Sequence, residues 1–303
     1  MPQEFREGYL TSDGYSIYHR EVGDGALGTI LCVHGGPGMT HDYLLPLADL
    51  AKFGYRVVFY DALGCGHSEL PQGVELFTLE HDLKVLDDVR QQLCQGPVHL
   101  MGSSYGGLLV LKYATLHHEE LRSVISTGGL SDVPFTIAEM NRLKQSLPQR
   151  VRDVLESHAA SGDFGSAEYL EAVQFFYRRH LCRMNPWPAE MTYSIEHVSL
   201  PVYLTMNGPN EFTIVGNIKN IEFTAELSKI TVPTLLVHGK YDEVTPRVGE
   251  RIRDHLPGSR LVVLPRSSHV GFWEERAKYM ALVRTFLHSV DRGGSSELAP
   301  PHQ

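Results

Sequence analysis

The stretch Gly-Ser-Ser-Tyr-Gly-Gly at residues 102–107 decides the fold class of this 303-residue chain. It follows an apolar run typical of a buried strand and opens a segment with helical spacing. Glycine-x-serine-x-glycine in that context is the pattern of a nucleophile elbow, a sharp turn that exposes a serine hydroxyl and needs small residues two positions either side. Gly102 and Gly106 flank Ser104 in this way, whereas Ser103 is flanked by methionine and tyrosine. We therefore interpret Ser104 as the nucleophile.

Two further residues supply the groups that a serine nucleophile needs. A serine hydroxyl is a weak nucleophile without a general base, and chains with this elbow place an acid and then a histidine after the serine. Asp242 follows an apolar run at 234–238, and His269 follows another at 261–264. Loops at the carboxyl ends of parallel strands gather at one edge of a sheet. We predict that Ser104, Asp242 and His269 form a catalytic triad.

A glycine-rich turn, His-Gly-Gly-Pro-Gly at 34–38, follows the apolar run at 29–33. Glycines allow backbone N–H groups to face a developing oxyanion, and the turn has the position of the oxyanion loop in lipases and esterases. We predict that the backbone N–H groups of Gly36 and of Tyr105, the residue after the nucleophile, donate to the oxyanion. A tight turn without a catalytic role is the alternative interpretation.

Strand-like runs and segments with helical spacing alternate through much of the chain, which indicates a parallel sheet with crossover helices. The first two runs flank a Ser-Asp-Gly turn and form an antiparallel hairpin at one edge. The sequence predicts an α/β fold of the α/β-hydrolase type, with a mostly parallel central sheet, helices on both faces and a helical cap insert. The predicted strands are 8–10, 15–21, 29–33, 56–60, 98–101, 124–127, 234–238 and 261–264, and the predicted helices are 43–52, 79–93, 105–116, 138–147, 150–160, 167–179 and 273–287.

The strand pattern stops between residues 131 and 229, where helix formers and aromatic residues dominate. We predict an α/β-hydrolase core at 1–130 and 230–291 and a helical cap at 131–229. The final segment, 292–303, is rich in Gly, Ser and Pro and has almost nothing to bury, so we expect a flexible tail.

Composition and charge favour an ordinary globular protein, with 42% hydrophobic and 21% charged residues. Asp and Glu number 36 against 27 Lys and Arg, and the formal charge of −9 argues against nucleic acid or an anionic membrane as a partner. No stretch approaches the roughly 18 apolar residues of a membrane span, and the amino terminus lacks an apolar signal segment. We therefore expect a cytoplasmic protein.

Cysteine and histidine spacing points away from metal chemistry. The four cysteines occur singly, without a Cys-x-x-Cys pair, which favours reduced thiols packed as small apolar groups. Neither the histidines nor the carboxylates have a metal-ligand spacing. We expect neither a metal nor a cofactor.

Taken together, these motifs resemble the proline iminopeptidases of the α/β-hydrolase fold, and within them the tricorn-interacting aminopeptidases. The resemblance covers nearly the whole chain, and GPNEF in the cap makes it highly specific. The motifs that carry it are HGGPG at 34–38, DALGCGHS at 61–68, GSSYGG at 102–107, MNGPNEF at 206–212, YDEVTP at 241–246 and SH at 268–269.

The resemblance implies an aminopeptidase that releases an amino-terminal residue, proline or another, from short peptides with a free N-terminus. It also implies that acidic residues bind the substrate α-ammonium, and the matching positions are Glu211 and Glu243. An ammonium group in a partly desolvated pocket needs carboxylate partners. From the residues alone, Glu243 is equally an exposed loop carboxylate. Cooperation with an upstream protease that produces oligopeptides is a further implication of the tricorn-interacting branch.

Three residues around these motifs need separate interpretation. Tyr105 stands where the family commonly has Trp, and Ala62 where it commonly has Gln, which bears on substrate preference rather than on the triad. Asp61 follows a predicted strand, but the triad already has an acid. We interpret Asp61 as a structural carboxylate that holds the turn at 64–68 through backbone N–H groups.

Two other functions are compatible with the same scaffold. An amino-acid amidase or an esterase uses the same triad and oxyanion loop, and independence from a free α-amine distinguishes it from an aminopeptidase. A receptor that only binds ligands beneath the cap is the other alternative, but it does not need all three triad groups.

Overall fold

Eight strands form one sheet at the centre of the protein. The structure, a computed structural model, describes residues 4–293; of the predicted tail at 292–303, residues 294–303 lie outside the described residues. The strand order is β1-β2-β4-β3-β5-β6-β7-β8, with β1–β2 and β2–β4 antiparallel and every other pair parallel. The predicted hairpin edge and parallel interior are confirmed. The strands are β1 Arg6–Ser12, β2 Tyr15–Val22, β3 Gly28–Val33, β4 Tyr55–Tyr60, β5 Val98–Ser103, β6 Leu121–Thr127, β7 Thr234–Gly239 and β8 Arg260–Leu264.

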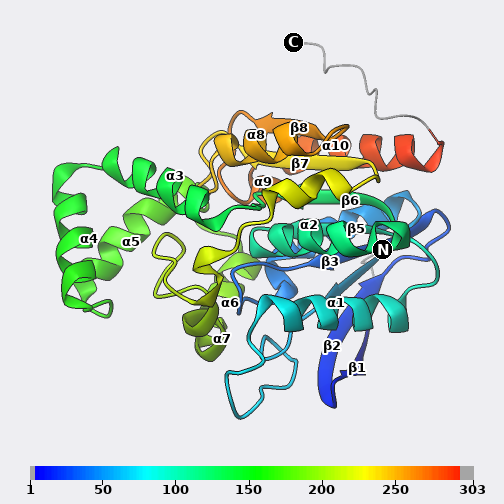
Figure 1. Cartoon of the computed structure of the whole chain (residues 1–303), viewed down its shortest axis with the longest axis horizontal. Helices are drawn as coiled ribbons and strands as arrows, with labels where there is room; N and C mark the ends of the chain where they lie inside the picture. Colours follow the sequence, from blue (N-terminus) through cyan, green and yellow to red (C-terminus); the bar gives the residue numbers. More distant parts are fainter. Residues whose placement is uncertain (1–3, 294–303) are drawn as a thin grey trace.

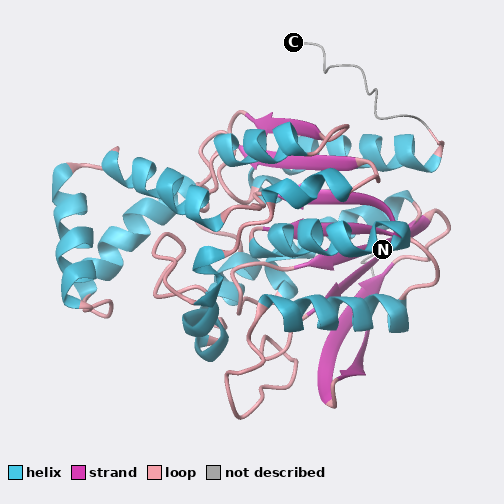
Figure 2. Cartoon of the chain, in the orientation of Figure 1, coloured by secondary structure: helices cyan, strands magenta, loops and turns pink. Residues whose placement is uncertain are grey.

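The interior strands are continuous apolar runs because helices cover both of their faces. Figure 2 shows the magenta strands between cyan helices. In Figure 1, α1, α2 and α8 lie along one face of the sheet, and η1 and α10 pack on the other. These elements are η1 His41–Phe53, α1 Leu79–Leu93, α2 Tyr105–His117, η2 His118–Glu120, α8 Pro246–His255, α9 Gly271–Glu274 and α10 Arg276–Asp291.

Two of the predicted helices differ in form from the structure. The predicted helix at 43–52 is the 3-10 helix η1, and Pro46 within it lacks the N–H that an α-helical hydrogen bond requires. The predicted helix at 273–287 is divided into α9 and α10 at Glu275, whose φ of −124° and ψ of 46° are not helical. The Glu275 carboxylate instead accepts hydrogen bonds from the Arg266 N–H and the Ser267 hydroxyl. It thereby holds the loop that precedes His269.

A group of helices between β6 and β7 projects from one end of the sheet (Figure 1, left). Its entry and exit segments are paired, because Asp132 and Glu222 form an isolated antiparallel bridge. The last short helix, η4, contacts α2 and α8 of the core. The division at residues 131 and 229 into core and cap remains our proposal. The elements in this segment are α3 Val133–Gln145, α4 Gln149–Ser161, α5 Ala167–His180, α6 Ala189–Glu196, α7 Leu200–Met206, η3 Asn217–Asn220 and η4 Thr224–Lys229.

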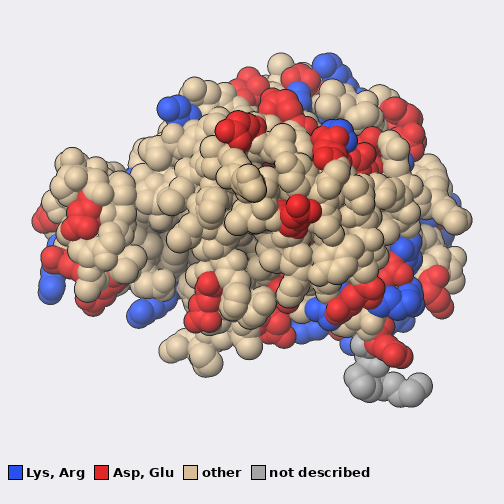
Figure 3. All heavy atoms as spheres, turned by 90° about the horizontal axis from the view of Figure 1, so that it is seen from below, with Lys and Arg blue, Asp and Glu red and all other residues tan. Residues whose placement is uncertain are grey.

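Charged side chains are unevenly distributed over the surface. On the face seen in Figure 3, Lys and Arg lie mostly toward the edges, and uncharged side chains cover much of the middle. None of the helices in residues 4–293 is both long and apolar enough to cross a membrane. All four cysteines are buried free thiols, as their spacing predicted.

Candidate active site

Ser104 lies on a strained turn between β5 and α2. Its φ of 59° and ψ of −124° lie outside the regions that L residues favour, and its N–H donates to the Thr127 carbonyl at 2.9 Å. A Cβ on Gly102 would lie 2.0 Å from the Gly106 carbonyl oxygen, and one on Gly106 would lie 2.3 Å from the Val33 carbonyl oxygen. The two glycines that selected Ser104 in the sequence are therefore required by close backbone approach.

The loops after β7 and β8 bring Asp242 and His269 together. His269 Nδ1 lies 2.6 Å from Asp242 Oδ1, and the same oxygen accepts the Val244 N–H at 2.8 Å. Both side chains are buried. Within the described chain, His269 Nε2 has no hydrogen-bond partner, and His269 lines the same cavity as Ser104. Ser104 and His269 thus line one cavity, and Asp242 is hydrogen-bonded to the far side of the histidine ring.

The space for the His269 ring depends on Gly128, a residue that the sequence analysis missed. Gly128 follows β6 with a φ of +54°, and a Cβ there would lie 2.6 Å from His269 Cε1. Any side chain at this position would displace the imidazole. The signal in the sequence is only a Gly-Gly pair after a predicted strand, because the neighbour that requires the glycine comes from a distant segment.

Three carboxylates act on the ionisation of His269. Burial alone would lower the pKa of His269, but its ion pair and hydrogen bond with Asp242, together with the negative charges of Glu243 and Glu211, raise that pKa to about 9. In the protein alone the imidazolium form is therefore favoured at neutral pH, and this form cannot accept a proton. A cation bound beside Glu211 and Glu243 would offset their charge and lower the pKa of His269.

The glycine-rich loop is held in place by a tyrosine from η1. The Tyr43 hydroxyl accepts the Gly35 N–H at 2.7 Å, and Gly36 has a φ of +44°. Within the described chain, the N–H groups of Gly36 and Tyr105 have no hydrogen-bond partner, and both residues line cavities that include Ser104. An oxyanion needs such free N–H donors, and the role of Gly36 and Tyr105 as these donors stays a prediction. Sequence analysis missed Tyr43, which has no motif of its own.

Glu243 is buried beside the catalytic loop rather than exposed. Its side chain is only 1% exposed, and its Oε2 has no partner among the described residues, so the exposed-loop alternative is wrong. Burial, followed by the negative charges of Glu211 and Asp242, raises the pKa of Glu243. Burial also raises the pKa of Glu211, whose Oε1 accepts the Tyr203 hydroxyl at 2.7 Å. Among the described residues, neither the buried Glu243 nor the partly buried Glu211 is paired with a lysine or arginine, which favours a cationic ligand.

Another buried carboxyl group, that of Asp82, supports Tyr105. The Tyr105 hydroxyl donates to Asp82 Oδ2 at 2.7 Å, and burial raises the pKa of Asp82 to about 7. Asp82 lies in the first turn of α1, where the sequence shows only an acidic residue at a helix start. The contact ties the residue after the nucleophile to a neighbouring helix.

Asp61 has the structural role that its position predicted. Its Oδ2 accepts the His67 N–H at 3.0 Å, and its Oδ1 accepts the His41 N–H at 2.8 Å. The side chain is fully buried and lies outside the cavities around Ser104. Asp61 therefore holds two loops together, the turn after β4 and the start of η1.

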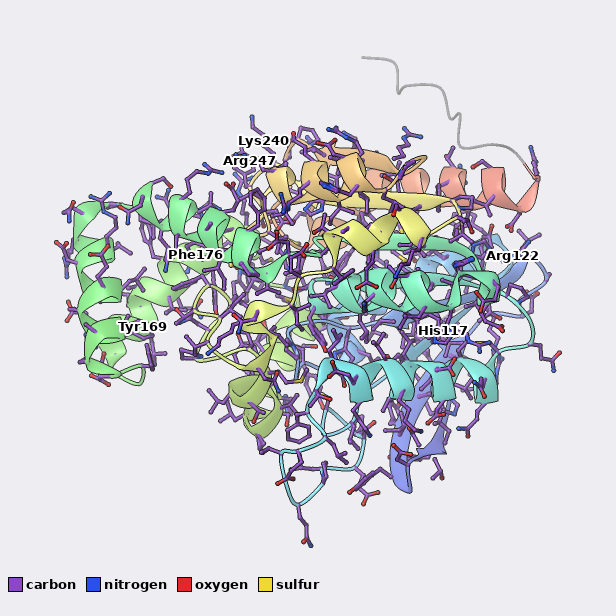
Figure 4. The ribbon with its side chains drawn as sticks, in the orientation of Figure 1. His117, Arg122, Tyr169, Phe176, Lys240 and Arg247 are labelled. Carbon is purple, nitrogen blue, oxygen red and sulfur yellow. The ribbon has the colours of Figure 1, made fainter. Side chains whose placement is uncertain are left out.

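Two cavities meet at Ser104. The larger encloses about 220 Å³ and is lined mainly by α5, α6 and α7, including Tyr169, which Figure 4 labels on α5 with Phe176. The smaller encloses about 30 Å³ and includes Tyr105 and Glu243. Within residues 4–293, His, Cys, Asp and Glu form no group of three or more that could hold a metal ion.

Comparison with known proteins places this site in a family. A family model described as alpha/beta hydrolase fold matches residues 28–276. The proline iminopeptidase of Saccharolobus solfataricus is 43% identical over 287 residues, which cover 94% of this chain and 93% of the relative. That of Thermoplasma volcanium is 42% identical over 284 residues, 93% of this chain and 96% of the relative. The chain belongs to the proline iminopeptidase family.

Solved structures agree with this assignment. The crystal structure of the proline iminopeptidase of Mycobacterium smegmatis has a TM-score of 0.89 and 30% identity, covering 95% of this chain and 99% of that chain. The crystal structure of VinJ has a TM-score of 0.92 and 34% identity, covering 95% and 100%. The predicted α/β-hydrolase fold and the resemblance to proline iminopeptidases are confirmed. The tricorn-interacting branch of the proline iminopeptidases stays a prediction.

Proposed function

We propose that the chain is a serine aminopeptidase that releases the N-terminal residue, proline or another, from short peptides with a free N-terminus. The observation that carries the proposal is the pair of carboxyl groups beside Ser104, of which Glu243 is buried and Glu211 is partly buried. A substrate α-ammonium between them supplies the cation that their burial requires. The small cavity next to Glu243 is lined partly by apolar side chains, among them Leu130, Met140 and Ile214, which suit contact with an apolar ring such as that of proline.

In the proposed acylation step, Ser104 Oγ attacks the carbonyl carbon of the first residue while His269 Nε2 accepts the hydroxyl proton. Asp242 holds the ring through Nδ1 and stabilises the imidazolium. The N–H groups of Gly36 and Tyr105 donate to the oxyanion of the tetrahedral intermediate. The imidazolium then gives its proton to the leaving amine nitrogen, the C–N bond breaks and an acyl-enzyme remains.

In the proposed deacylation step, a water molecule takes the place of the leaving amine. His269 Nε2 accepts a proton from the water as its oxygen attacks the acyl carbon. The same nitrogen then returns that proton to Ser104 Oγ as the ester bond breaks. The free amino acid leaves, and the site returns to its initial state.

Substrate binding and base activation are coupled in this mechanism. The pKa of His269 is raised by the charges of Asp242, Glu243 and Glu211. The bound α-ammonium offsets the charges of the two glutamates, which lowers the pKa of His269 and leaves Nε2 free to accept a proton. A substrate with a blocked amine cannot supply this cation. The amine is therefore a requirement for catalysis as well as for binding.

The decisive experiment measures hydrolysis of proline, alanine, leucine and phenylalanine anilides, each with a free and an acetylated amine, beside a simple acyl ester. Turnover of the free-amine anilides alone supports the aminopeptidase, and their ranking gives its specificity. Equal turnover of the acetylated anilides or the ester would instead establish the amidase or esterase. A Ser104→Ala variant should lose roughly 10⁴- to 10⁶-fold in kcat.

A matched pair of variants tests the amine site. Glu243→Gln keeps the size of the side chain and removes its charge, so we expect a large loss of kcat/KM on free-amine anilides. Glu250→Gln makes the same change on the exposed surface of α8 and should leave kcat/KM unchanged. Equal activity of both variants would remove Glu243 from the proposed amine site.

Two further parts of the proposal concern the setting of the reaction. A cytoplasmic location is supported by the four buried cysteines, which remain free thiols.

Short peptides are the substrates, and an upstream protease that produces oligopeptides is the partner whose products this site would consume. Neither a metal nor a cofactor enters the proposed steps.

A further inference from the structure

The two cavities at Ser104 differ in which catalytic groups they contain. Both include Gly36, Ser104 and Glu211. The smaller also contains Glu243, the second proposed ammonium partner, whereas the larger contains His269. The proposed general base, His269, and the proposed ammonium partner, Glu243, therefore line different cavities at Ser104.

The position of His269 assigns the larger cavity to the leaving group. In acyl transfer by this mechanism, the histidine that takes the serine proton returns it to the leaving nitrogen, so that nitrogen must come within hydrogen-bond distance of Nε2. The chain attached to the leaving nitrogen then extends into the cavity that contains His269. The α-ammonium and the first residue lie on the opposite side, near Glu243.

Apart from His269 and Glu211, the larger cavity is lined by uncharged and mainly apolar side chains. In the part of the chain that the structure describes, no lysine or arginine lines it. Three of its tyrosine hydroxyls are already engaged with the loop at 210–211, because those of Tyr169 and Tyr177 accept from Asn210 Nδ2 and the Glu211 N–H and that of Tyr203 donates to Glu211. The hydroxyl of Tyr43 accepts the Gly35 N–H. The walls therefore present mainly ring and aliphatic surface, with Gln174 as a further uncharged amide.

The cavity also has an apolar mouth. Leu170 on α5 and Leu200 and Leu204 on α7 line it, and they remain 50%, 58% and 54% exposed. Leu200 and Leu204 are four residues apart and share one face of α7. These three half-exposed leucines of α5 and α7 continue the apolar lining toward solvent.

We propose that this larger cavity is a leaving-group site for an uncharged apolar amine, so that preferred substrates carry an apolar chain directly after the scissile bond. The inference rests on the proposed function and adds a substrate class to it. A free dipeptide is disfavoured, because the carboxylate of its second residue would enter an apolar cavity without a cationic partner. The apolar amine belongs either to a peptide with an apolar second residue or to a non-peptide alkylamine.

The first experiment is a leaving-group series on the unmodified protein. Prolyl n-alkylamides from methyl to octyl are compared by kcat/KM, together with prolyl-leucine, prolyl-leucinamide and prolyl-glycinamide. We expect kcat/KM to rise about two- to fourfold with each methylene that leaves water. Prolyl-leucinamide should exceed prolyl-leucine by about tenfold or more. The leucinamide-to-glycinamide ratio shows whether peptides or only alkylamines use the site.

Failure of the inference and failure of the proposed function give different results in this series. If the methylamide is turned over but kcat/KM stays flat with chain length, or if prolyl-leucine matches its amide, the leaving-group site is wrong and the aminopeptidase stands. If no free-amine substrate in the series is turned over, the aminopeptidase itself is wrong.

Surface variants provide a second test. Leu204→Asp and Leu170→Asp place a charge at the mouth, so we expect the octylamide-to-methylamide ratio of kcat/KM to fall by about tenfold or more. Leu116→Asp makes the same change at a 48% exposed leucine of α2 that does not line the cavity, and it should leave the ratio unchanged. An unchanged ratio in both mouth variants would overturn the assignment of the mouth.

Discussion

His269 is surrounded by carboxyl groups, and its pKa of about 9 gives the activity a definite pH dependence. The profile of kcat/KM reports the free enzyme, so we expect it to fall as the pH drops below about 9, because the imidazolium cannot accept the Ser104 proton. The profile of kcat reports the substrate complex. Its acid limb should lie at lower pH, because the bound ammonium offsets Glu211 and Glu243. Steady-state rates from pH 5 to 10 measure both limbs.

One variant separates this explanation from a general effect of pH on the fold. Glu243→Gln removes one of the charges that raise the pKa of His269, so the acid limb of kcat/KM should move to lower pH. Glu250→Gln serves as the control and should leave the limb in place. Identical acid limbs for kcat and kcat/KM in the unmodified protein would show that substrate binding does not change the pKa of His269.

Asp82 gives a prediction about stability rather than rate. Because its pKa in the folded protein is raised to about 7, its contribution to stability is present at low pH and is lost as the pH rises toward 7. The side chain in Asp82→Asn cannot ionise, so this variant does not lose stability in that way. Its free energy of unfolding, relative to that of the unmodified protein, should therefore increase from pH 4 to pH 7.5, by roughly 2–4 kcal/mol at most. Urea unfolding at both pH values measures the difference.

The control for Asp82 lies on the same helix. Glu80→Gln removes an exposed carboxylate from the first turn of α1 and should show no such gain with pH. A constant difference between Asp82→Asn and the unmodified protein at both pH values would mean that the Asp82 carboxyl group does not change its ionisation in this range.

The sequence predicted the roles of residues that belong to a local motif. It did not predict the roles of residues that depend on a contact with a distant part of the chain. Ser104 is identified by its flanking glycines, which the elbow needs for steric reasons that act within a few residues. Gly128, Tyr43 and Asp82 have no such local signal, since each is required by a neighbour from a distant segment. The burial of Glu243 likewise has no local signal, and its backbone N–H donates to the carbonyl of His180 at the end of α5, a distant segment.

At the scale of elements, the predicted strands were the most secure part of the fold, because buried parallel strands are continuous apolar runs. Helix α8 was not predicted: it has only Val248, Gly249 and Ile252 buried, so its apolar stripe is too narrow to stand out. The short helices α6 and α7 were also not identified individually. Their few turns show too little periodicity, and packing against the core supplies their stability.

Helices α3 and α8 are joined through one buried carboxylate, which gives a prediction at this scale. Glu139 on α3 accepts hydrogen bonds from the Thr245 hydroxyl at 2.9 Å and from Arg247, labelled in Figure 4, at 2.6 Å. Glu139→Ala leaves the Thr245 hydroxyl without this partner, so we expect a loss of about 1–3 kcal/mol in unfolding free energy. Chemical denaturation measures it.

The comparison for Glu139 is an exposed carboxylate in the same group of helices. Glu156→Ala on α4 should change the unfolding free energy by no more than about 0.5 kcal/mol. Equal losses in the two variants would mean that the contact between α3 and α8 contributes little, and that the general removal of negative charge accounts for both.

At the scale of the whole molecule, the cap limits which N-termini can reach Ser104. The nucleophile lines cavities of about 220 and 30 Å³, and α5, α6 and α7 line the larger of them. A folded domain cannot enter such a space, whereas an extended peptide can. We expect release of an N-terminal proline from a short peptide but not from a folded protein that begins with the same residues.

Mass spectrometry of both substrates after equal incubation checks this prediction. The same protein, unfolded and reduced to fragments by another protease, should become a substrate, which shows that its sequence was acceptable. Release at similar rates from the folded protein and the short peptide would mean that the cap opens widely enough to admit a whole domain.

The paired entry and exit of the cap, at Asp132 and Glu222, has a consequence for how such a protein can change over generations. The Val133 N–H donates to the Ile221 carbonyl, and the Phe223 N–H to the Ser131 carbonyl, so the two ends of the inserted segment lie side by side. A segment with adjacent ends can be lengthened, shortened or exchanged without altering the order of the strands. The inserted segment can therefore change, and with it the substrates that the site accepts, while the loops that hold the proposed triad stay on an unchanged sheet.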